Sequence, residues 1–270
     1  YTFCLITPTV VSMPKFAANL SFLFTERPFA ERFALAAQSG FAGVEYLFPY
    51  EWPAEQVQKW LREAGLEQVL FNLPAGNWAA GERGLACLPG RESEFSESVE
   101  QALSYASALA CTRVHCMAGL RPPGVSEAVI EACYVANVRL AADRLAVAGV
   151  TVMLEPIHSR IDMPGYWLDD IHRAFRLLER VDRSNVKLQL DIYHAQIMQG
   201  DLARTLSANI DRIGHVQIAD NPGRHEPGSG EINFPYLFNL LDELGYSAWV
   251  GCEYRPRGRT QDSFAWRKNV

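Results

Sequence analysis

Hydrophobic and polar positions follow two alternating patterns along the chain. Amphipathic stretches with apolar residues at helical spacing end at glycines, and a run of apolar, β-branched or aromatic residues follows each glycine. In the first helical stretch, Phe29, Phe33 and Ala37 recur at helical spacing between Pro28 and Gly40. Glycine can take the left-handed conformation that closes a helix. The pattern therefore predicts helices that end at Gly40, Gly65, Gly149 and Gly245.

The apolar runs between the helical stretches predict eight strands. Several runs are apolar on both faces, which is typical of parallel strands covered by helices. Strands alternating with helices form βαβ units, and eight units close most simply into an α/β (β/α)8 TIM barrel, with a doubly wound open sheet as the alternative. The predicted strands lie near residues 16–20, 43–48, 68–73, 113–118, 150–155, 186–191, 213–219 and 248–254.

Chain length and composition agree with one domain. The chain has 270 residues, of which 49% are hydrophobic, enough to bury one sizeable core. No low-complexity tract or linker divides it, so we assign residues 13–270 to one barrel domain. Residues 1–12 are apolar, but they have no basic leader and are too short to span a bilayer. We interpret them as an extension before a natural start at Met13, and we expect no membrane partner.

Charge and cysteine usage exclude some classes of protein. The formal net charge is −6 and no Lys/Arg cluster compensates for it, which argues against nucleic acid as a partner. The six cysteines form no CxxC pair and no small disulfide framework. A reducing, cytoplasmic setting is therefore expected. A homo-oligomer is compatible with this sequence.

Four polar residues end apolar runs that are about one strand-helix unit apart: Glu155, Asp191, Gln217 and Glu253. In a barrel the carboxyl ends of the strands meet at one edge, where the active site lies. Three carboxylates and a carboxamide offer only oxygen ligands, which suits Mg2+ or Mn2+. The alternative is that each residue ends its strand separately, in its own salt bridge.

Six stretches of the chain form a recognisable set of motifs: FNLPAGNWAAGERGLACLPGR (71–91), LEPI (154–157), LDIYHAQ (190–196), HVQIAD (215–220), RHEPGSGEINFPYLF (224–238) and GCEYRPRG (251–258). The stretch RHEPGSGEINFPYLF is the most specific, whereas LEP or CEY alone would be weak. Together these stretches resemble the hydroxypyruvate isomerase family of the xylose isomerase-like barrels. The resemblance runs from Phe16 to about Trp266.

The resemblance implies a metal site formed by the four strand-end residues, with Glu155 and Glu253 also acting as the catalytic acid/base pair. Related sugar epimerases look similar around Asp191 and His194 but usually carry histidine in place of Gln217, which favours the isomerase branch. One departure is Asn77, which stands where the family pattern has aspartate.

The implied reaction interconverts hydroxypyruvate and 2-hydroxy-3-oxopropanoate (tartronate semialdehyde) through a shared enediolate. A divalent cation would stabilise the oxyanion, one glutamate would remove a proton and the other would return one. The substrate carboxylate needs cationic or donor groups, for which arginine forks are well suited. The candidates are Arg83, Arg91, Arg224, His225 and His194, although Arg83 and Arg91 could equally be solvated loop charges.

Other polar residues carry weaker predictions. His115 ends the fourth apolar run and either faces the pocket or is a buried structural residue. Glu45 is expected to form hydrogen bonds at the rim. Glu226 and Glu231 are interpreted as loop structure or a subunit contact.

Alternative functions remain open at this point. A 2-oxo-tetronate isomerase or a ketose 3-epimerase would share the barrel and the proton chemistry, and a sugar-acid binding protein would not be catalytic. A nuclease of the endonuclease IV type would need more metal-binding histidines than the six in this chain, and a basic surface.

Overall fold

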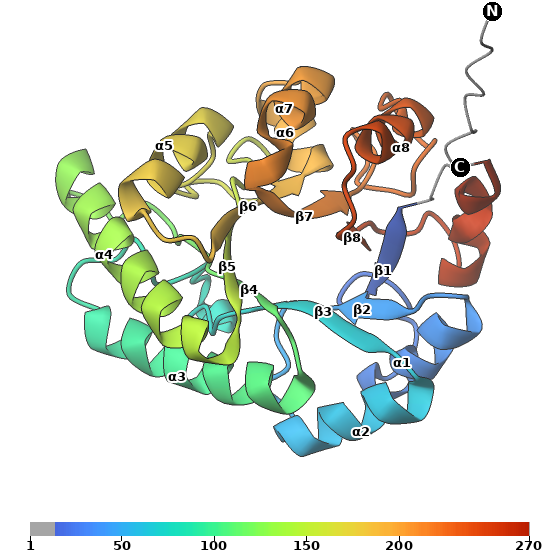
Figure 1. The fold of residues 1–270 in the computed structure, drawn as a ribbon, viewed down its shortest axis with the longest axis horizontal. Coiled ribbons are helices and arrows are strands. Elements are labelled where there is room, and N and C mark those ends of the chain that lie inside the picture. The colour runs from blue at the N-terminus through green and yellow to red at the C-terminus, as the bar shows by residue number, and fades with distance from the viewer. Residues whose placement is uncertain (1–13, 270) are drawn as a thin grey trace, which may run out of the picture.

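The computed structural model describes residues 14–269, which form a closed barrel of eight parallel strands. The strands pair in sequence order, and β1 pairs with β8 to close the ring (Figure 1). The predicted (β/α)8 barrel is therefore confirmed and the open sheet is excluded. The strands are β1 (Lys15–Asn19), β2 (Gly43–Glu45), β3 (Glu67–Asn72), β4 (Arg113–His115), β5 (Thr151–Leu154), β6 (Val186–Asp191), β7 (Ile213–Ile218) and β8 (Trp249–Cys252).

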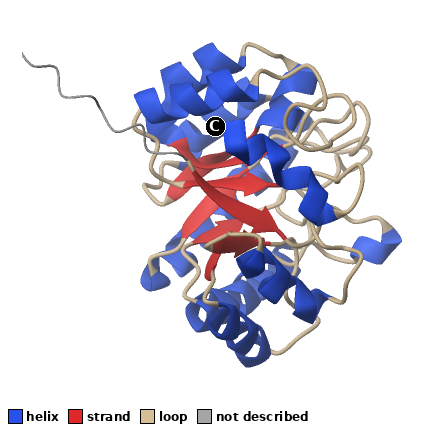
Figure 2. Ribbon diagram, turned by 90° about the vertical axis from the view of Figure 1, so that its right-hand side faces the viewer, coloured by secondary structure: helices blue, strands red, loops and turns tan. Residues whose placement is uncertain are grey.

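Helices surround the strands, as the side view shows (Figure 2). Each connection between consecutive strands carries one α-helix, except that two short α-helices follow β6. Four 3-10 segments complete the chain. The helices are α1 (Phe29–Gln38), α2 (Ala54–Ala64), α3 (Glu92–Leu109), α4 (Glu127–Leu145), α5 (Ile171–Val181), α6 (Ile192–Met198), α7 (Leu202–Asn209) and α8 (Phe234–Glu243), and the 3-10 segments are η1 (Trp78–Ala80), η2 (Ala146–Ala148), η3 (Ile210–Arg212) and η4 (Thr260–Asn269).

Glycines close several helices as the sequence pattern predicted. Gly65 caps α2 in the left-handed conformation, with φ 66°. Two other helices end without glycine: α3 is capped by Ala110 and α5 by Asp182, each with φ 51°. Left-handed backbone is less favourable for alanine than for glycine, so the end of α3 at Ala110 departs from the glycine pattern.

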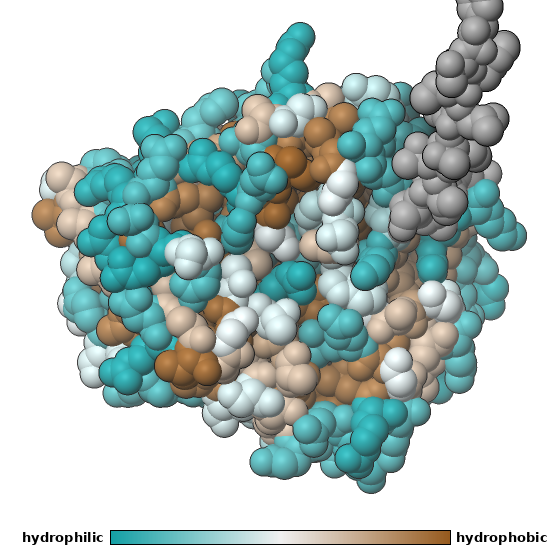
Figure 3. All heavy atoms as spheres, viewed as in Figure 1, coloured by the Kyte–Doolittle hydropathy of each residue, from teal (hydrophilic) through white to brown (hydrophobic). Residues whose placement is uncertain are grey.

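The C-terminal segment η4 packs beside β1, and this contact joins the two ends of the described chain. The rings of Phe16 and Trp266 meet edge to face, with centroids 5.0 Å apart. Hydrophilic residues dominate the outline of the face drawn in Figure 3, with smaller hydrophobic patches between them. Among residues 14–269, no helix is long and apolar enough to cross a membrane. The predicted extension at residues 1–12 and the start at Met13 lie outside the described residues.

Candidate active site at the carboxyl ends of the strands

The barrel brings the four predicted strand-end residues to one end of the sheet. Glu155 directly follows β5, Asp191 is the last residue of β6, Gln217 lies in β7 and Glu253 directly follows β8. In the strand register Asp191 pairs with Gln217, so these residues lie at the same height. All four side chains are buried. Glu155 and Glu253 line one cavity of about 180 Å³, which is small compared with the roughly 300–1,000 Å³ of sites for drug-sized ligands.

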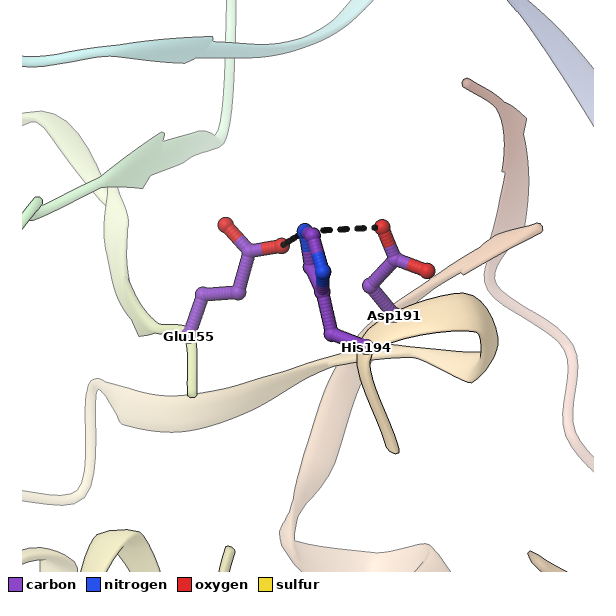
Figure 4. Close-up of side chains that lie close together, drawn as sticks. All are labelled: Glu155, Asp191 and His194. Atoms are coloured by element: carbon purple, nitrogen blue, oxygen red, sulfur yellow. Dashed lines mark ion pairs between the residues drawn. The ribbon is translucent and has the colours of Figure 1, made fainter. Parts of the chain in front are cut away.

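Glu155, Asp191 and His194 form a compact cluster on one side of this cavity. One potential ligand atom of each residue lies within 4.8 Å of the others, and Figure 4 shows the imidazole of His194 between the two carboxylates. The Nε2 atom of His194 is 3.5 Å from Oδ2 of Asp191 and 3.9 Å from Oε1 of Glu155. The sequence prediction placed His194 near the substrate, and the structure places it beside two predicted metal ligands.

The two carboxylate oxygens of Asp191 have different surroundings. Its Oδ1 accepts a hydrogen bond from the backbone N–H of Tyr193 at 2.8 Å and so caps α6. Its Oδ2 is buried and has no hydrogen-bond partner among residues 14–269. Nε2 of His194 lies 3.5 Å from Oδ2, and Nη2 of Arg224 lies 3.9 Å from it. Buried polar atoms are nearly always paired, so an unpartnered carboxylate oxygen here fits a cation ligand.

Glu253 is held from three directions. Its Oε2 accepts hydrogen bonds from the side-chain amides of Asn19 at 2.8 Å and Gln217 at 2.7 Å. Its Oε1 accepts from Nη2 of Arg224 at 2.6 Å. Charge-assisted hydrogen bonds of this kind fix the position of a carboxyl group, so Glu253 is more constrained than Glu155.

A second polar layer lies below Glu253, inside the barrel. The amide oxygen of Gln217 accepts from Gln189 at 2.6 Å, and its amide nitrogen donates to Glu45 at 2.8 Å as well as to Glu253. Glu45 also contacts Nε2 of His215 at 2.6 Å and is fully buried. It therefore lies inside the barrel and not at the rim. The oxygen of Gln217 already accepts this hydrogen bond from Gln189. It can bind a cation only if the side-chain amides of Gln217 and Gln189 both rotate, so that each exchanges the positions of its oxygen and nitrogen atoms.

Burial sets the electrostatics of the three acids. It raises the pKa of Glu155 well above the usual value, and the nearby charges of Glu253 and Asp191 raise it further. Burial also raises the pKa of Asp191 to about 6 and that of Glu253 to about 8, although Arg224 opposes both shifts. Three buried carboxylates repel one another when ionised. A divalent cation would relieve that repulsion, so the donor set fits one.

His115 lies beside Glu155 in the wall of the cavity. Its Nδ1 lies 3.3 Å from Oε2 of Glu155, and it lines the cavity. Burial lowers the pKa of His115 to about 3, so the ring is neutral near pH 7. Of the two roles left open for this residue, the structure supports the one in which it faces the pocket.

Three of the predicted substrate-binding residues line the cavity, namely Arg83, Arg224 and His194. The guanidinium of Arg83 stacks on Trp78, 4.2 Å from the ring centroid. Arg224 is buried, and its Nη1 donates to Asp162 at 2.9 Å. Arg83 is thus the less constrained of the two arginines.

The structure places the other two candidates elsewhere. In the described part of the chain, Arg91 and His225 do not belong to the cavity lining. Arg91 pairs with Glu82 and with Glu94, so its charge is already matched. Nδ1 of His225 is 2.7 Å from the backbone oxygen of Arg255. Both side chains serve loop structure.

Sequence reasoning missed several residues that line the cavity. Arg255, Asn72, Trp78 and Ile157 lie within the stretches that resemble the family, and that was the available signal for them. The others come from loops or from positions inside strands, where no pattern in one sequence marks them. The missed lining residues are Phe22, Leu47, Asn72, Trp78, Met117, Ile157, Asp162, Met163, Gln189 and Arg255.

The long loop after β7 is organised around Asp220. Its carboxylate accepts from the backbone N–H groups of Gly228, Gly230 and Ile232, at 2.9 to 3.1 Å. Arg224 lies within this loop and has a left-handed φ of 55°. The RHEPGSGEINFP stretch therefore builds the support that turns Arg224 toward Glu253.

Two acidic loop residues and Asn77 have local structural roles. Glu226 accepts from the backbone and side chain of Arg257, and Glu231 from Asn221 and Gln196, as the loop interpretation expected. Oδ1 of Asn77 accepts from the N–H of Ala80 at 3.0 Å and caps η1. Asparagine can make this cap as aspartate does.

The chain belongs to the xylose isomerase-like TIM barrel family, whose model matches residues 33–270. Among curated proteins, the 2-oxo-tetronate isomerase of Cupriavidus necator is 50% identical over 95% of this chain and 98% of that protein. The hydroxypyruvate isomerase of Escherichia coli K12 is 47% identical over 94% of this chain and 98% of that protein. These relatives confirm the resemblance to hydroxypyruvate isomerases.

A solved structure extends the comparison. The crystal structure described as an AP endonuclease of family 2 from Brucella melitensis has a TM-score of 0.93 and 51% identity, covering 96% of this chain and 99% of that one. The barrel and its loops are thus shared at close to full length with this structure.

Proposed function

We propose that this protein is a hydroxypyruvate isomerase, which interconverts hydroxypyruvate and 2-hydroxy-3-oxopropanoate by proton transfer. The observation that carries the proposal is the pair of buried glutamates, Glu155 and Glu253, that line the same small cavity from β5 and β8. The similarity to curated isomerases over nearly the whole chain supports it.

The proposed cofactor is a divalent cation, Mg2+ or Mn2+, held by Glu155, Asp191 and Glu253. The unpartnered Oδ2 of Asp191 supports this choice, as do the carboxylate oxygens that Glu155 and Asp191 bring within 4.8 Å of one another. Gln217 remains a predicted fourth ligand, which requires its amide to turn. When bound, the cation would stabilise negative charge that develops on the substrate oxygens.

The two glutamates of the chain have different surroundings, which supports different roles. Glu155 is less constrained, and burial raises its pKa, which favours a carboxyl that can hold a proton it has removed from the substrate. Glu253 is held by Arg224, Asn19 and Gln217 on the opposite side of the site. We propose that Glu155 removes the first proton and that Glu253 returns one at the neighbouring carbon.

The substrate carboxylate needs a cation that is not already paired with an acid. Arg83 meets this condition, because its hydrogen-bond partners are neutral: Nη1 donates to the backbone oxygens of Trp78 and Glu82. Arg255 is exposed and also lines the cavity. We propose Arg83 as the main anchor and Arg255 as a second one, while Arg224 positions Glu253.

The test is an NMR assay of metal-loaded protein with hydroxypyruvate in D2O. Proton transfer predicts conversion to 2-hydroxy-3-oxopropanoate with deuterium from solvent in the product. Product without solvent deuterium would indicate a hydride shift. Absence of turnover with undiminished ligand binding would instead support a non-catalytic sugar-acid binding protein, and replacing Glu155 or Glu253 by glutamine would then be harmless.

A four-carbon substrate is the second candidate, because one of the similar relatives is named 2-oxo-tetronate isomerase. The two reactions share the same proton chemistry, so only pocket length separates them. A ketose 3-epimerase would need room for a longer sugar. Product analysis with three-, four- and six-carbon substrates at equal concentration discriminates among the three, and the highest kcat/KM identifies the substrate.

Three further proposals concern binding of nucleic acid, cellular compartment and oligomeric state. The net charge of −6 disfavours nucleic acid, and cleavage of DNA with an abasic site would contradict that. The five described cysteines are free thiols, which supports the predicted cytoplasmic setting. A homo-oligomer remains a prediction that sedimentation equilibrium can test.

A further inference from the structure

A relay of hydrogen bonds leads from the loop after β5 to the cavity. The backbone N–H of Asp162 donates to Nε2 of His158 at 2.9 Å. Nδ1 of His158 lies 2.8 Å from Nδ1 of His194, which lines the cavity. Both imidazoles are buried, with 0% and 3% of their surface exposed. Solvent therefore does not compete for these bonds.

The direction of every bond in this relay follows from its first donor. A backbone amide can only donate, so Nε2 of His158 accepts and carries no proton. Because a histidine ring keeps at least one proton, that of His158 is on Nδ1. This proton points at Nδ1 of His194, which must accept it. The proton of a neutral His194 then lies on Nε2.

We propose that His158 is a positioning residue that fixes His194 in the tautomer with its proton on Nε2. His194 then presents a hydrogen-bond donor to the cavity, and not a lone pair to a cation. The nearest carboxylate oxygen, Oδ2 of Asp191, is 3.5 Å from Nε2, too far for a strong hydrogen bond. The donor is therefore available to a substrate oxygen, a role that rests on the proposed function.

This assignment separates two roles within the cluster drawn in Figure 4. Glu155 and Asp191 offer oxygen atoms to a cation, whereas His194 supplies a hydrogen that can stabilise an oxyanion on the substrate. Asp162 serves both halves of the site, because its N–H orients His158 and its carboxylate accepts from Arg224.

Nitrogen-15 NMR of histidine-labelled, metal-free protein tests the tautomer directly, since protonated and bare ring nitrogens resonate far apart. We expect Nε2 of His194 to be protonated in the wild type and in His158→Asn, whose side-chain amide can donate from the place of Nδ1. His158→Leu removes the donor, and we expect the single tautomer to be lost. A wild-type His194 protonated on Nδ1, or an unchanged tautomer in His158→Leu, would overturn the proposal.

Two further measurements separate this inference from the proposed function. Addition of Mg2+ should leave the Nε2 proton in place, and its loss would show that His194 is a metal ligand.

In the isomerase assay, His158→Leu should lower kcat about 10-fold with little change in KM, and His158→Asn should recover most of the loss. An unchanged kcat in His158→Leu would remove the positioning role. A wild type without isomerase activity would refute the proposed function, while the NMR result still decides the tautomer.

Discussion

The side-chain amide nitrogen of Gln217 lies 2.7 Å from Oε2 of Glu253, and the same nitrogen lies 2.8 Å from Oε1 of Glu45. Asn19 makes the equivalent pair of contacts, at 2.8 Å to Glu253 and 3.0 Å to Glu45. Two amides thus bridge Glu253, the proposed catalytic residue, and a buried glutamate beneath it. The position of Glu253 depends on Glu45, which does not line the cavity among the described residues.

Replacing Gly251 by alanine tests this dependence. A Cβ at Gly251 would lie 2.3 to 2.5 Å from the carboxylate of Glu45, so Glu45 must move and its two amide partners with it. We expect a loss of about 1–3 kcal/mol in the free energy of unfolding, as for overpacking. Because small displacements of reacting groups cost up to about 100-fold in rate, we also expect kcat to fall by 10-fold or more. Urea unfolding and steady-state kinetics measure the two effects.

Gly258 provides the matched control. No atom lies within 4 Å of a Cβ added there, and neither glycine has a left-handed φ. Gly258→Ala should therefore leave stability and kcat unchanged. Equal losses in the two variants would show that the bridge to Glu45 does not set the position of Glu253.

The sequence predicted the barrel and the end of the barrel at which the candidate site lies, because both depend on features that repeat along the chain. Apolar runs that end in Glu155, Asp191 and Glu253 are visible without coordinates, and parallel strands bring such ends together. The lower layer was missed because sequence does not say how deep a residue lies in the barrel. Glu45 ends an apolar run as Glu155 does, yet it contacts His215 in the interior.

Loop residues were less predictable for a different reason. Arg83 and Arg91 look equivalent in the sequence, and only the fold shows that Glu82 and Glu94 already neutralise Arg91. The His158 relay was not anticipated, because its first donor is a backbone N–H that any residue except proline would provide at position 162. Contacts of this kind depend on loop conformation and leave no pattern of residue types.

The two loop arginines can be compared by the same substitution. Arg83→Gln should lower kcat/KM for hydroxypyruvate by about 10- to 100-fold, mainly through KM, because a hydrogen bond to a charged group contributes roughly 1.5–3 kcal/mol. Arg91→Gln should stay within about twofold, since Arg91 does not line the cavity. Similar losses in both variants would count against Arg83 as the carboxylate anchor.

Asp191→Asn tests the metal site without removing the helix cap. Asparagine can still accept from the N–H of Tyr193, but the charge at the unpartnered Oδ2 is gone. We expect the affinity for Mn2+ to fall by about 3 kcal/mol or more, roughly two orders of magnitude in the dissociation constant. Calorimetric titration measures it. Asp170→Asn is the control, because Asp170 caps α5 and is not in the cluster. Unchanged Mn2+ binding in Asp191→Asn would exclude Asp191 as a ligand.

The metal-free protein should lose stability between about pH 6.5 and 8. A carboxyl whose pKa is higher in the folded state than in the unfolded state holds more protons when folded, so stability falls as pH rises toward the folded pKa. Glu253, with a pKa of about 8, has this property, and burial raises that of Glu155 as well. The lowered pKa of His115, about 3, acts in the opposite direction but only below about 6.5, the unfolded value.

Above pH 6.5 the raised pKa values of the acids therefore determine how stability changes with pH. Glu253 alone lowers the free energy of unfolding by about 2 kcal/mol by pH 8. Urea unfolding at several pH values in the presence of a chelator measures the slope. Glu253→Gln should reduce it by more than half, because removing one charge also lowers the pKa of Glu155, which Glu253 raises. Saturating Mg2+ should flatten the wild-type slope, since a bound cation favours the ionised acids. An identical slope in wild type and Glu253→Gln would mean that the buried acids are already ionised in the metal-free protein.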